Sequence, residues 1–474
     1  MSEVDRNKKD RYNLFIIVLT LVLGYLITLL PFPTSFSPKA VTMVAIVFVS
    51  AVFWITECLP IALTGLVVIL LQAVTGIQGI SDGLKHIANP VNSIIFAGYI
   101  MATALSKYNL DRRISLHIVA AMGERTDMLF LGLMIATAFL SMWISNSAAA
   151  AIMMPIALGI VNMTDHQPGQ SNLGKIMMIG IAYAANIGGM GTPAGTPASS
   201  ITIALTRDLA HHEIKFLDWC IRAVPMVILL VPVGWFILLK LYPPEIKRIA
   251  GGTAEVKKEL KQLGPMSAVQ KKVVVLFLLA ILLWISDSFF TLLPGWLYIA
   301  SVFIAIIFVM PKVGVVTWKE AAPEIGWDIF ILVGGGLALG SGLNSTGVIK
   351  IIAEYLSVVL RGTSLYIVAG SIALITALSI TVFSSLTATA TTFVPVTIGL
   401  AMALGLPPVP LATLAGLSSC CAFMIPANTP PNAIVYKSGY FKSYEMAKAG
   451  IIFIIVSAVI LALWFSLVWT PIQV

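Results

Sequence analysis

Two short polar segments interrupt otherwise apolar sequence, and they resemble each other. Residues 145–147 read Ser-Asn-Ser, and residues 385–387 read Ser-Leu-Thr. Ten residues after the start of each segment stands a proline, Pro155 or Pro395. Polar, irregular backbone at membrane depth is tolerated only where it faces protein or a water-filled cavity. In transporters built from repeats, interrupted apolar segments at matching positions indicate the binding site.

A second pair of polar breaks follows the first. Gly195-Thr196-Pro197 in one half corresponds to Asn428-Thr429-Pro430 in the other. No Lys, Arg, Asp or Glu occurs between Asp127 and Asp165, or between Arg361 and Lys437. A ligand at these breaks must therefore be bound by hydroxyls, amides and helix ends.

Helix N-termini carry free N–H groups and about half a positive charge, so they bind anions. We expect four half-helices to begin at the breaks and to suit a small anion with two negative ends. Freed carbonyls and helix C-termini suit Na⁺. The candidate substrate-binding residues are Ser145, Asn146, Ser147, Thr196, Pro197, Ser385, Thr387, Thr429 and Pro430.

A simpler interpretation is that these residues only pack helices together, as Ser, Thr and Gly commonly do in membranes. Asn146 argues against it, because a buried amide is costly unless its hydrogen bonds are satisfied. The repetition of the pattern at two hairpin tips favours a binding role.

Composition indicates a membrane protein of α-helices. The chain has 474 residues, of which 58% are hydrophobic and 11% charged, whereas about 25% are charged in soluble domains. The apolar runs are long and do not alternate, which excludes a β-barrel. The net charge of +8 fits Lys and Arg gathered in cytoplasmic loops better than a nucleic-acid partner.

Spans need about twenty apolar residues each. The segments 128–162 and 365–402 are too long for one span, and each is predicted to be a re-entrant hairpin with its tripeptide at the tip and its second arm after the tripeptide. The segments 174–206 and 408–436 are predicted to be spans unwound at membrane depth. Full spans are expected near 13–32, 40–57, 60–78, 92–107, 217–241, 270–290, 293–311, 327–344 and 446–470, with interfacial helices at 109–125 and 347–361.

The matched breaks predict an internal repeat. A cytoplasmic segment and first span (1–37) precede one repeat (38–243), a polar, basic linker (244–267) and a second repeat (268–474). With the N-terminus inside, most of the 29 Lys and Arg residues fall in cytoplasmic loops, as the positive-inside rule requires. The second repeat then enters from the opposite side, so the repeats are expected to be inverted.

At these residues the chain resembles the divalent anion–sodium symporter family, whose members carry di- and tricarboxylates or sulfate. The resemblance rests on the paired tripeptides and on Trp54-Ile-Thr-Glu-Cys-Leu-Pro60, Gly334-Gly-Gly336 and Thr429-Pro-Pro-Asn-Ala-Ile434. It implies eleven spans plus two hairpins, a homodimer in a bacterial cytoplasmic membrane, and an elevator motion. It also implies that Asn146, Ser147, Thr387 and the two Thr-Pro pairs bind substrate, and that Ser145, Asn146 and Gly195 form a Na⁺ site.

The chain departs from the family motif, Ser-Asn-Thr, in two places. Ser147 keeps the hydroxyl of Thr, but Leu386 replaces the second Asn and offers no oxygen, which leaves a second Na⁺ site in doubt. We therefore expect an exchanger of C4 and C5 dicarboxylates (malate, succinate, fumarate or 2-oxoglutarate) without an organic cofactor. A Na⁺-coupled symporter and an anion channel are the alternatives. An enzyme is not expected, because the charge-free core offers no acid–base pair.

Overall fold

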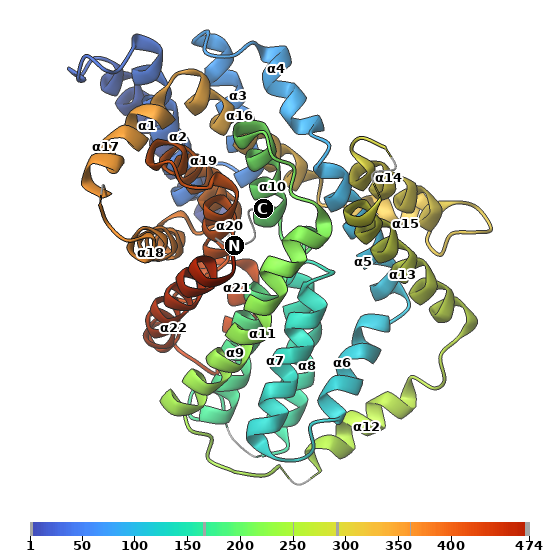
Figure 1. The fold of residues 1–474 in the computed structure, drawn as a ribbon. Helices are drawn as coiled ribbons and strands as arrows, with labels where there is room; N and C mark the ends of the chain where they lie inside the picture. The colour runs from blue at the N-terminus through green and yellow to red at the C-terminus, as the bar shows by residue number, and fades with distance from the viewer. Residues whose placement is uncertain (1–2, 165–166, 250, 291–292, 361, 470–474) are drawn as a thin grey trace.

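The computed structural model describes residues 3–164, 167–249, 251–290, 293–360 and 362–469, and this part of the chain is helical throughout apart from turns and loops (Figure 1). Nine of the described helices are long and apolar enough to cross a membrane. The chain is thus an all-α, multi-pass membrane protein. Residues 1–2 of the predicted N-terminal segment and 470–474 of the second predicted repeat lie outside the described residues.

The first half of the chain contains twelve α-helices. Their bounds are α1 Glu3–Thr28, α2 Pro38–Thr56, α3 Ile61–Val74, α4 Ile80–Lys85, α5 Asn92–Lys107, α6 Leu110–Ala120, α7 Thr126–Ser141, α8 Asn146–Asn162, α9 Asn172–Gly189, α10 Pro197–Ala210, α11 Phe216–Leu241 and α12 Gly252–Gln262.

The second half continues with ten more. Their bounds are α13 Ala268–Phe289, α14 Trp296–Val309, α15 Trp318–Ala321, α16 Trp327–Ser345, α17 Val348–Leu360, α18 Leu365–Phe383, α19 Leu386–Leu404, α20 Pro408–Ser418, α21 Pro430–Tyr436 and α22 Ser443–Trp464.

Helical pairs occupy the places of the predicted hairpins and unwound spans. α7 and α8 are joined by a four-residue turn, and α18 and α19 by two residues, Ser384 and Ser385. α9 and α10 are separated by residues 190–196, and α20 and α21 by residues 419–429. Each half therefore has a hairpin followed by an interrupted helix. That the two sets have inverted orientations remains a prediction.

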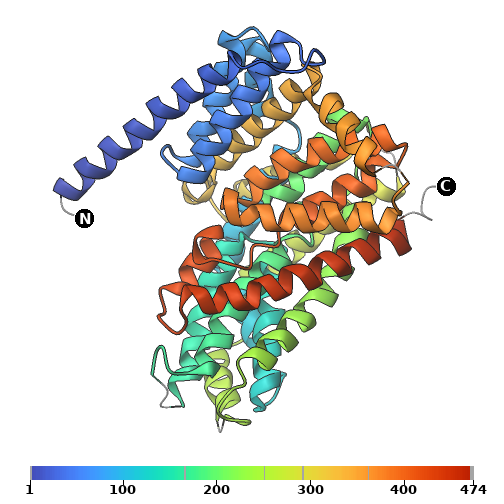
Figure 2. The same ribbon diagram turned by 90° about the vertical axis from the view of Figure 1, so that its left-hand side faces the viewer.

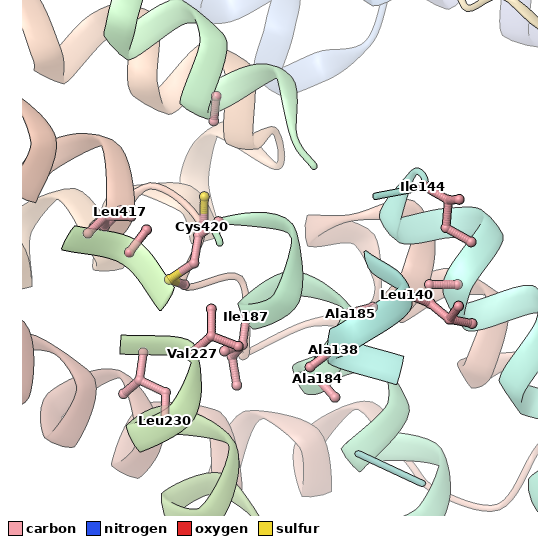
Figure 3. Packing of buried hydrophobic residues seen from close by; sticks show 14 of the residues in the cluster. Ala138, Leu140, Ile144, Ala184, Ala185, Ile187, Val227, Leu230, Leu417 and Cys420 are labelled. Atoms are coloured by element: carbon pink, nitrogen blue, oxygen red, sulfur yellow. The ribbon is translucent and has the colours of Figure 1, made fainter. Parts of the chain in front are cut away.

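Helix α1 packs against α2 at the edge of the molecule. It extends away from the body of the molecule with its N-terminal end free (Figure 2), and only 11% of its apolar window is buried. By contrast, α9 is almost wholly enclosed. Figure 3 shows Ala138 of α7 beside Ala184 and Ala185 of α9, where small side chains let the two helices approach closely.

The structure corrects one sequence expectation and adds a helix to the predicted linker. The second arm of each hairpin begins inside the tripeptide, at Asn146 or Leu386, because the preceding serine already acts as the N-cap. The predicted linker 244–267 contains a helix, α12, which packs against α6. Its polar, charged composition gave no apolar signal, and the ion pair between Arg112 and Glu259 (2.9 Å) helps to hold it.

Helices α3 and α16 pack with their backbones nearly touching. A Cβ on Gly65 would lie 2.9 Å from the carbonyl oxygen of Ile331, and a Cβ on Gly335 would collide with the backbone of Gly65. Only glycine permits this approach. Gly335, the middle residue of the Gly-Gly-Gly motif at 334–336, thus sets the distance between two helices that lie beside the site described below.

We expect Gly335→Ala to destabilise the protein by about 1–3 kcal/mol, the usual effect of overpacking, because the backbone of α3 cannot move aside as a flexible side chain would. The measurement is thermal unfolding of the purified protein in detergent. Gly159→Ala is the matched control, since a Cβ there meets nothing within 4 Å. Equal unfolding temperatures for the two variants would contradict the close contact.

Candidate functional site

The first hairpin presents its polar residues at the start of α8. The Ser145 side chain caps this helix by accepting a hydrogen bond from the Ala148 N–H (3.2 Å). Asn146 and Ser147 then occupy the first two helical positions, where backbone N–H groups have no partner within the helix. The cap thus fixes the direction of α8 and leaves N–H groups directed away from the helix end.

The second hairpin repeats this arrangement with different residues. Ser384 has a left-handed backbone conformation (φ 49°) that ends α18. Ser385 caps α19 by accepting from the Ala388 N–H (3.3 Å). Leu386 and Thr387 follow at the positions that correspond to Asn146 and Ser147.

The interrupted helices restart in the same way in both halves. Thr196 precedes α10 with extended backbone (φ −146°, ψ 144°), and Thr429 precedes α21 with nearly the same angles (φ −151°, ψ 154°). Pro197 and Pro430 are the first helical residues, where the missing N–H has no consequence. Because α21 has only seven residues, three of the four expected half-helices are of substantial length.

These four breaks meet at one cavity of about 500 Å³. All the residues predicted from the sequence line it: Ser145, Asn146, Ser147, Gly195, Thr196, Pro197, Ser385, Thr387, Thr429 and Pro430. The structure thus brings together residues that are up to 285 positions apart in the chain, as the span from Ser145 to Pro430 shows.

The cavity offers hydrogen-bond donors without partners. The hydroxyls of Thr196 and Thr429 are buried, and neither has a hydrogen-bond partner in the described structure. Buried polar groups are almost always satisfied, so each exception calls for an explanation. Together with the free N–H groups that begin α8 and α19, these hydroxyls could bind the oxygens of an anion.

The remaining wall comes from residues that the sequence did not identify as candidates for binding. Pro60 and Ile61 at the start of α3, Tyr99 of α5, and Asp328 and Leu332 of α16 also line the cavity. Among the described lining residues Asp328 alone carries a charge. An acidic residue in the first turn of an apolar helix is common because it stabilises the helix dipole, so its position gave no distinctive signal.

A cluster of oxygens beside the first hairpin suits a small cation. A Cβ placed on Gly195 would lie 2.5 Å from the carbonyl oxygen of Gly189 and 2.9 Å from that of Ser141. Neither carbonyl accepts a hydrogen bond from any residue that the structure describes. The Oδ1 atom of Asn146 lies nearby, 2.2 Å from where a Cβ on Gly189 would stand. Hard cations prefer such carbonyl and amide oxygens.

Of the predicted Na⁺ ligands, Asn146 and Gly195 lie in this cluster, and the structure adds Ser141 and Gly189. The Ser145 side chain caps α8, and its place in the Na⁺ site stays a prediction. The Ser141 hydroxyl lies 2.7 Å from both Asn146 Oδ1 and the carbonyl oxygen of Ala185, which orients the amide. These supporting residues resemble ordinary packing residues in sequence, so they could not be identified without the fold.

Buried amides connect the two halves behind the cavity. The Asn186 side chain of α9 donates to the Ala422 carbonyl and to Asn432 Oδ1, each at 3.0 Å. Asn432 in turn donates to Ala422 and to Ile425 (3.0 Å each). This network satisfies carbonyls of the unwound segment 419–429 and ties that segment to the opposite half.

Comparison with known proteins places the chain in a family. A model of the sodium:sulfate symporter transmembrane region matches residues 11–474, so the chain belongs to this family of transporters and is not an enzyme. The sodium-dependent dicarboxylate transporter SdcS of Staphylococcus saprophyticus is 35% identical over 485 aligned residues, which cover 96% of this chain and 92% of that protein. SdcS of Staphylococcus aureus (strain MSSA476) is 36% identical, with 94% and 89% covered.

The fold also has a counterpart among solved structures. The crystal structure of the YdaH transporter of Alcanivorax borkumensis superposes with a TM-score of 0.51, covering 80% of this chain and 86% of that one, at 12% sequence identity. At this identity the likeness concerns the fold alone. It supports the polytopic, all-helical fold.

We expect Gly195→Ala to weaken Na⁺ binding at least about tenfold, which corresponds to about 1.4 kcal/mol, because the added methyl group would occupy the space between the Gly189 and Ser141 carbonyls. Ligands stabilise the folded state that binds them, so the measurement is the rise in unfolding temperature with added NaCl, compared with choline chloride. Gly159→Ala should retain the wild-type response. An unchanged response in Gly195→Ala would exclude this cluster as the cation site.

Proposed function

We propose that this protein carries C4 and C5 dicarboxylates across the membrane, with Na⁺ bound at the first hairpin as the coupling ion. The observation that carries this proposal is the cavity in which two hairpin tips and two helix breaks present unpartnered N–H groups and hydroxyls. Of the described lining residues none is a Lys or Arg, so an anion there is bound by helix ends and neutral side chains.

A dicarboxylate fits because the donors occur in two similar sets. Ser147, Thr196 and the start of α8 form one set, and Thr387, Thr429 and the start of α19 form the other. Each set suits one carboxylate. The SdcS relatives are named as dicarboxylate transporters, which supports malate, succinate, fumarate or 2-oxoglutarate as the substrate over a single-centred anion such as sulfate.

The oxygen cluster supports Na⁺ coupling. A cation among the oxygens of Ser141, Gly189 and Asn146 lies next to the N-terminus of α8 and stabilises the anion bound there. The name of the SdcS relatives, which describes them as sodium-dependent, supports this coupling.

Exchange of one dicarboxylate for another is the second candidate mode, and Leu386 favours it. Leucine provides no ligand at the position where Asn146 stands in the first half. When the carrier is empty, the helix N-termini face one another without an anion between them. The empty carrier therefore moves back across the membrane slowly, and exchange is faster than net uptake.

The transport movement is also part of the proposal. α7–α11 and α18–α22 carry the site and would move as one body against α2–α5 and α13–α16, as in an elevator mechanism. A homodimer would hold the second group still. The inverted orientation of the two halves and a cytoplasmic N-terminus complete this arrangement.

Uptake of labelled succinate into proteoliposomes tests the function. We expect uptake to require external Na⁺, to saturate, and to be inhibited by malate and fumarate. Uptake that ignores Na⁺ but needs internal dicarboxylate would instead establish the exchanger. Absence of uptake under both conditions would contradict dicarboxylate transport.

Asn146→Ala should reduce succinate uptake at least about tenfold, which corresponds to about 1.4 kcal/mol, since it removes an oxygen that faces the cation and an amide at the cavity. The protein should still fold, because the Ser145 cap of α8 is retained. Asn344→Ala, which changes an exposed amide at the end of α16, is the control. Wild-type uptake by Asn146→Ala would show that the hairpin tip only packs.

A further inference from the structure

The cavity has two kinds of wall. The residues of the hairpin tips and helix breaks form one wall, and they carry its hydroxyl and amide side chains. The other described lining residues belong to α3, α5 and α16, together with Pro60 directly before α3. Of the side chains in this second wall, the α3–α5–α16 wall, only those of Tyr99 and Asp328 are polar.

Six of the described helices begin at this cavity. The helices α3, α8, α10, α19 and α21 line it with their first residues, and α16 lines it with its second and third. Among these six, α16 alone has an acidic residue in its first turn, Asp328. A carboxylate there offsets the partial positive charge of the helix N-terminus. The start of α16 therefore presents negative charge to the cavity, whereas the other five starts do not.

The charge of Asp328 is not neutralised by the protein. Its side chain forms no hydrogen bond or ion pair with the residues that the structure describes, and the residue is exposed. The start of α16 lies directly against α5, because a Cβ on Gly326 would stand 2.5 Å from the Tyr99 hydroxyl oxygen. The carboxylate therefore acts through solvent on any anion that enters the cavity.

This wall decides what a substrate may carry beyond two carboxylates. The two proposed donor sets, at the starts of α8 and α19, each hold one carboxylate, so any further substituent must face the α3–α5–α16 wall. An uncharged substituent can pack there against apolar side chains such as Ile329 and Leu332. A third carboxylate would lose water against apolar surface and stand near a like charge, and both effects are unfavourable.

We propose that Asp328 makes this carrier select dicarboxylates over tricarboxylates by repelling a third carboxylate. The inference rests on the proposed function, because it takes two carboxylates to be held at the hairpin tips. Two like charges about 10 Å apart repel enough to weaken binding about two- to sixteenfold, for an effective dielectric constant between about 80 and about 20.

The test is competition against labelled succinate uptake in proteoliposomes by two analogues of equal shape. One is 2-(carboxymethyl)succinate, which has three carboxylates, and the other is 2-(carbamoylmethyl)succinate, in which an amide replaces the third. The ratio of their inhibition constants isolates the effect of the third charge. We expect Asp328→Asn to lower this ratio about two- to sixteenfold and Asp328→Glu, which keeps the charge, to preserve it.

Glu324→Gln is the matched control. It removes a nearby acidic charge that is also exposed but does not line the cavity, so the ratio should remain that of wild type. An unspecific effect of surface charge on anion entry would instead change the ratio in both variants, and that result would contradict the role of Asp328.

Salt provides a second measurement that needs no variant. Repulsion through solvent is screened as ionic strength rises, so the wild-type ratio should fall when choline chloride is added at constant Na⁺. The ratio for Asp328→Asn should change little. A purely structural role of Asp328 at the start of α16 would not produce this salt dependence, and the wild-type series remains decisive if Asp328→Asn does not fold.

Three results would overturn the inference: an unchanged ratio in Asp328→Asn, a wild-type ratio independent of salt, or equally weak inhibition of wild type by both analogues, which would mean exclusion by size. Succinate uptake that unlabelled succinate does not inhibit would overturn the proposed function and this inference with it. Normal competition by succinate together with an unchanged ratio would overturn only the role of Asp328.

Discussion

The site depends on one constraint, which is that backbone groups freed by a helix break inside a membrane must find partners. A break leaves N–H groups on the helix that begins and carbonyl groups on the helix that ends. Here four breaks meet at one cavity. The N–H groups can be satisfied by an anion and the carbonyls by a cation, so an arrangement suited to both follows from how the chain is interrupted.

Away from the cavity, side chains of the protein itself satisfy the freed backbone groups. Asn186 and Asn432 satisfy carbonyls of the unwound segment 419–429 from within the protein. Gly189 and Gly195 instead leave carbonyl oxygens close together and uncovered, because these two residues have no side chain. Some freed carbonyls are thus hydrogen-bonded permanently within the protein, whereas others are left without a partner and can accept a ligand.

Much of this arrangement could be predicted from the sequence, because the breaks are visible as polar residues within apolar runs. The lining residues Asn146, Thr196 and Thr429 were found in this way. Ser141 and Gly189 were not, since their proposed role lies in backbone carbonyls that any residue possesses. Asn428 was noted only as a neighbour of Thr429, and its hydrogen bond to Ile380, 48 positions away, depends on tertiary packing that no local pattern records.

The number of coupling ions has an energetic consequence that connects the two candidate modes of transport. Carboxyl groups with pKa values near 4 are ionised at neutral pH, so a dicarboxylate accompanied by one Na⁺ moves with a net charge of −1. Its entry against an inside-negative potential costs about 2.3 kcal/mol per 100 mV, whereas a tenfold Na⁺ gradient contributes only about 1.4 kcal/mol.

Net accumulation of the dianion by such a carrier is therefore weakly driven. Exchange of one Na⁺-bound dicarboxylate for another moves no net charge and is free of this opposition. A carrier that binds a single Na⁺ at its first hairpin would therefore favour exchange while still requiring Na⁺ there. Sodium dependence and exchange would then be two properties of the same site, one set by the open carbonyls of Ser141 and Gly189 and the other by Leu386, which supplies no oxygen.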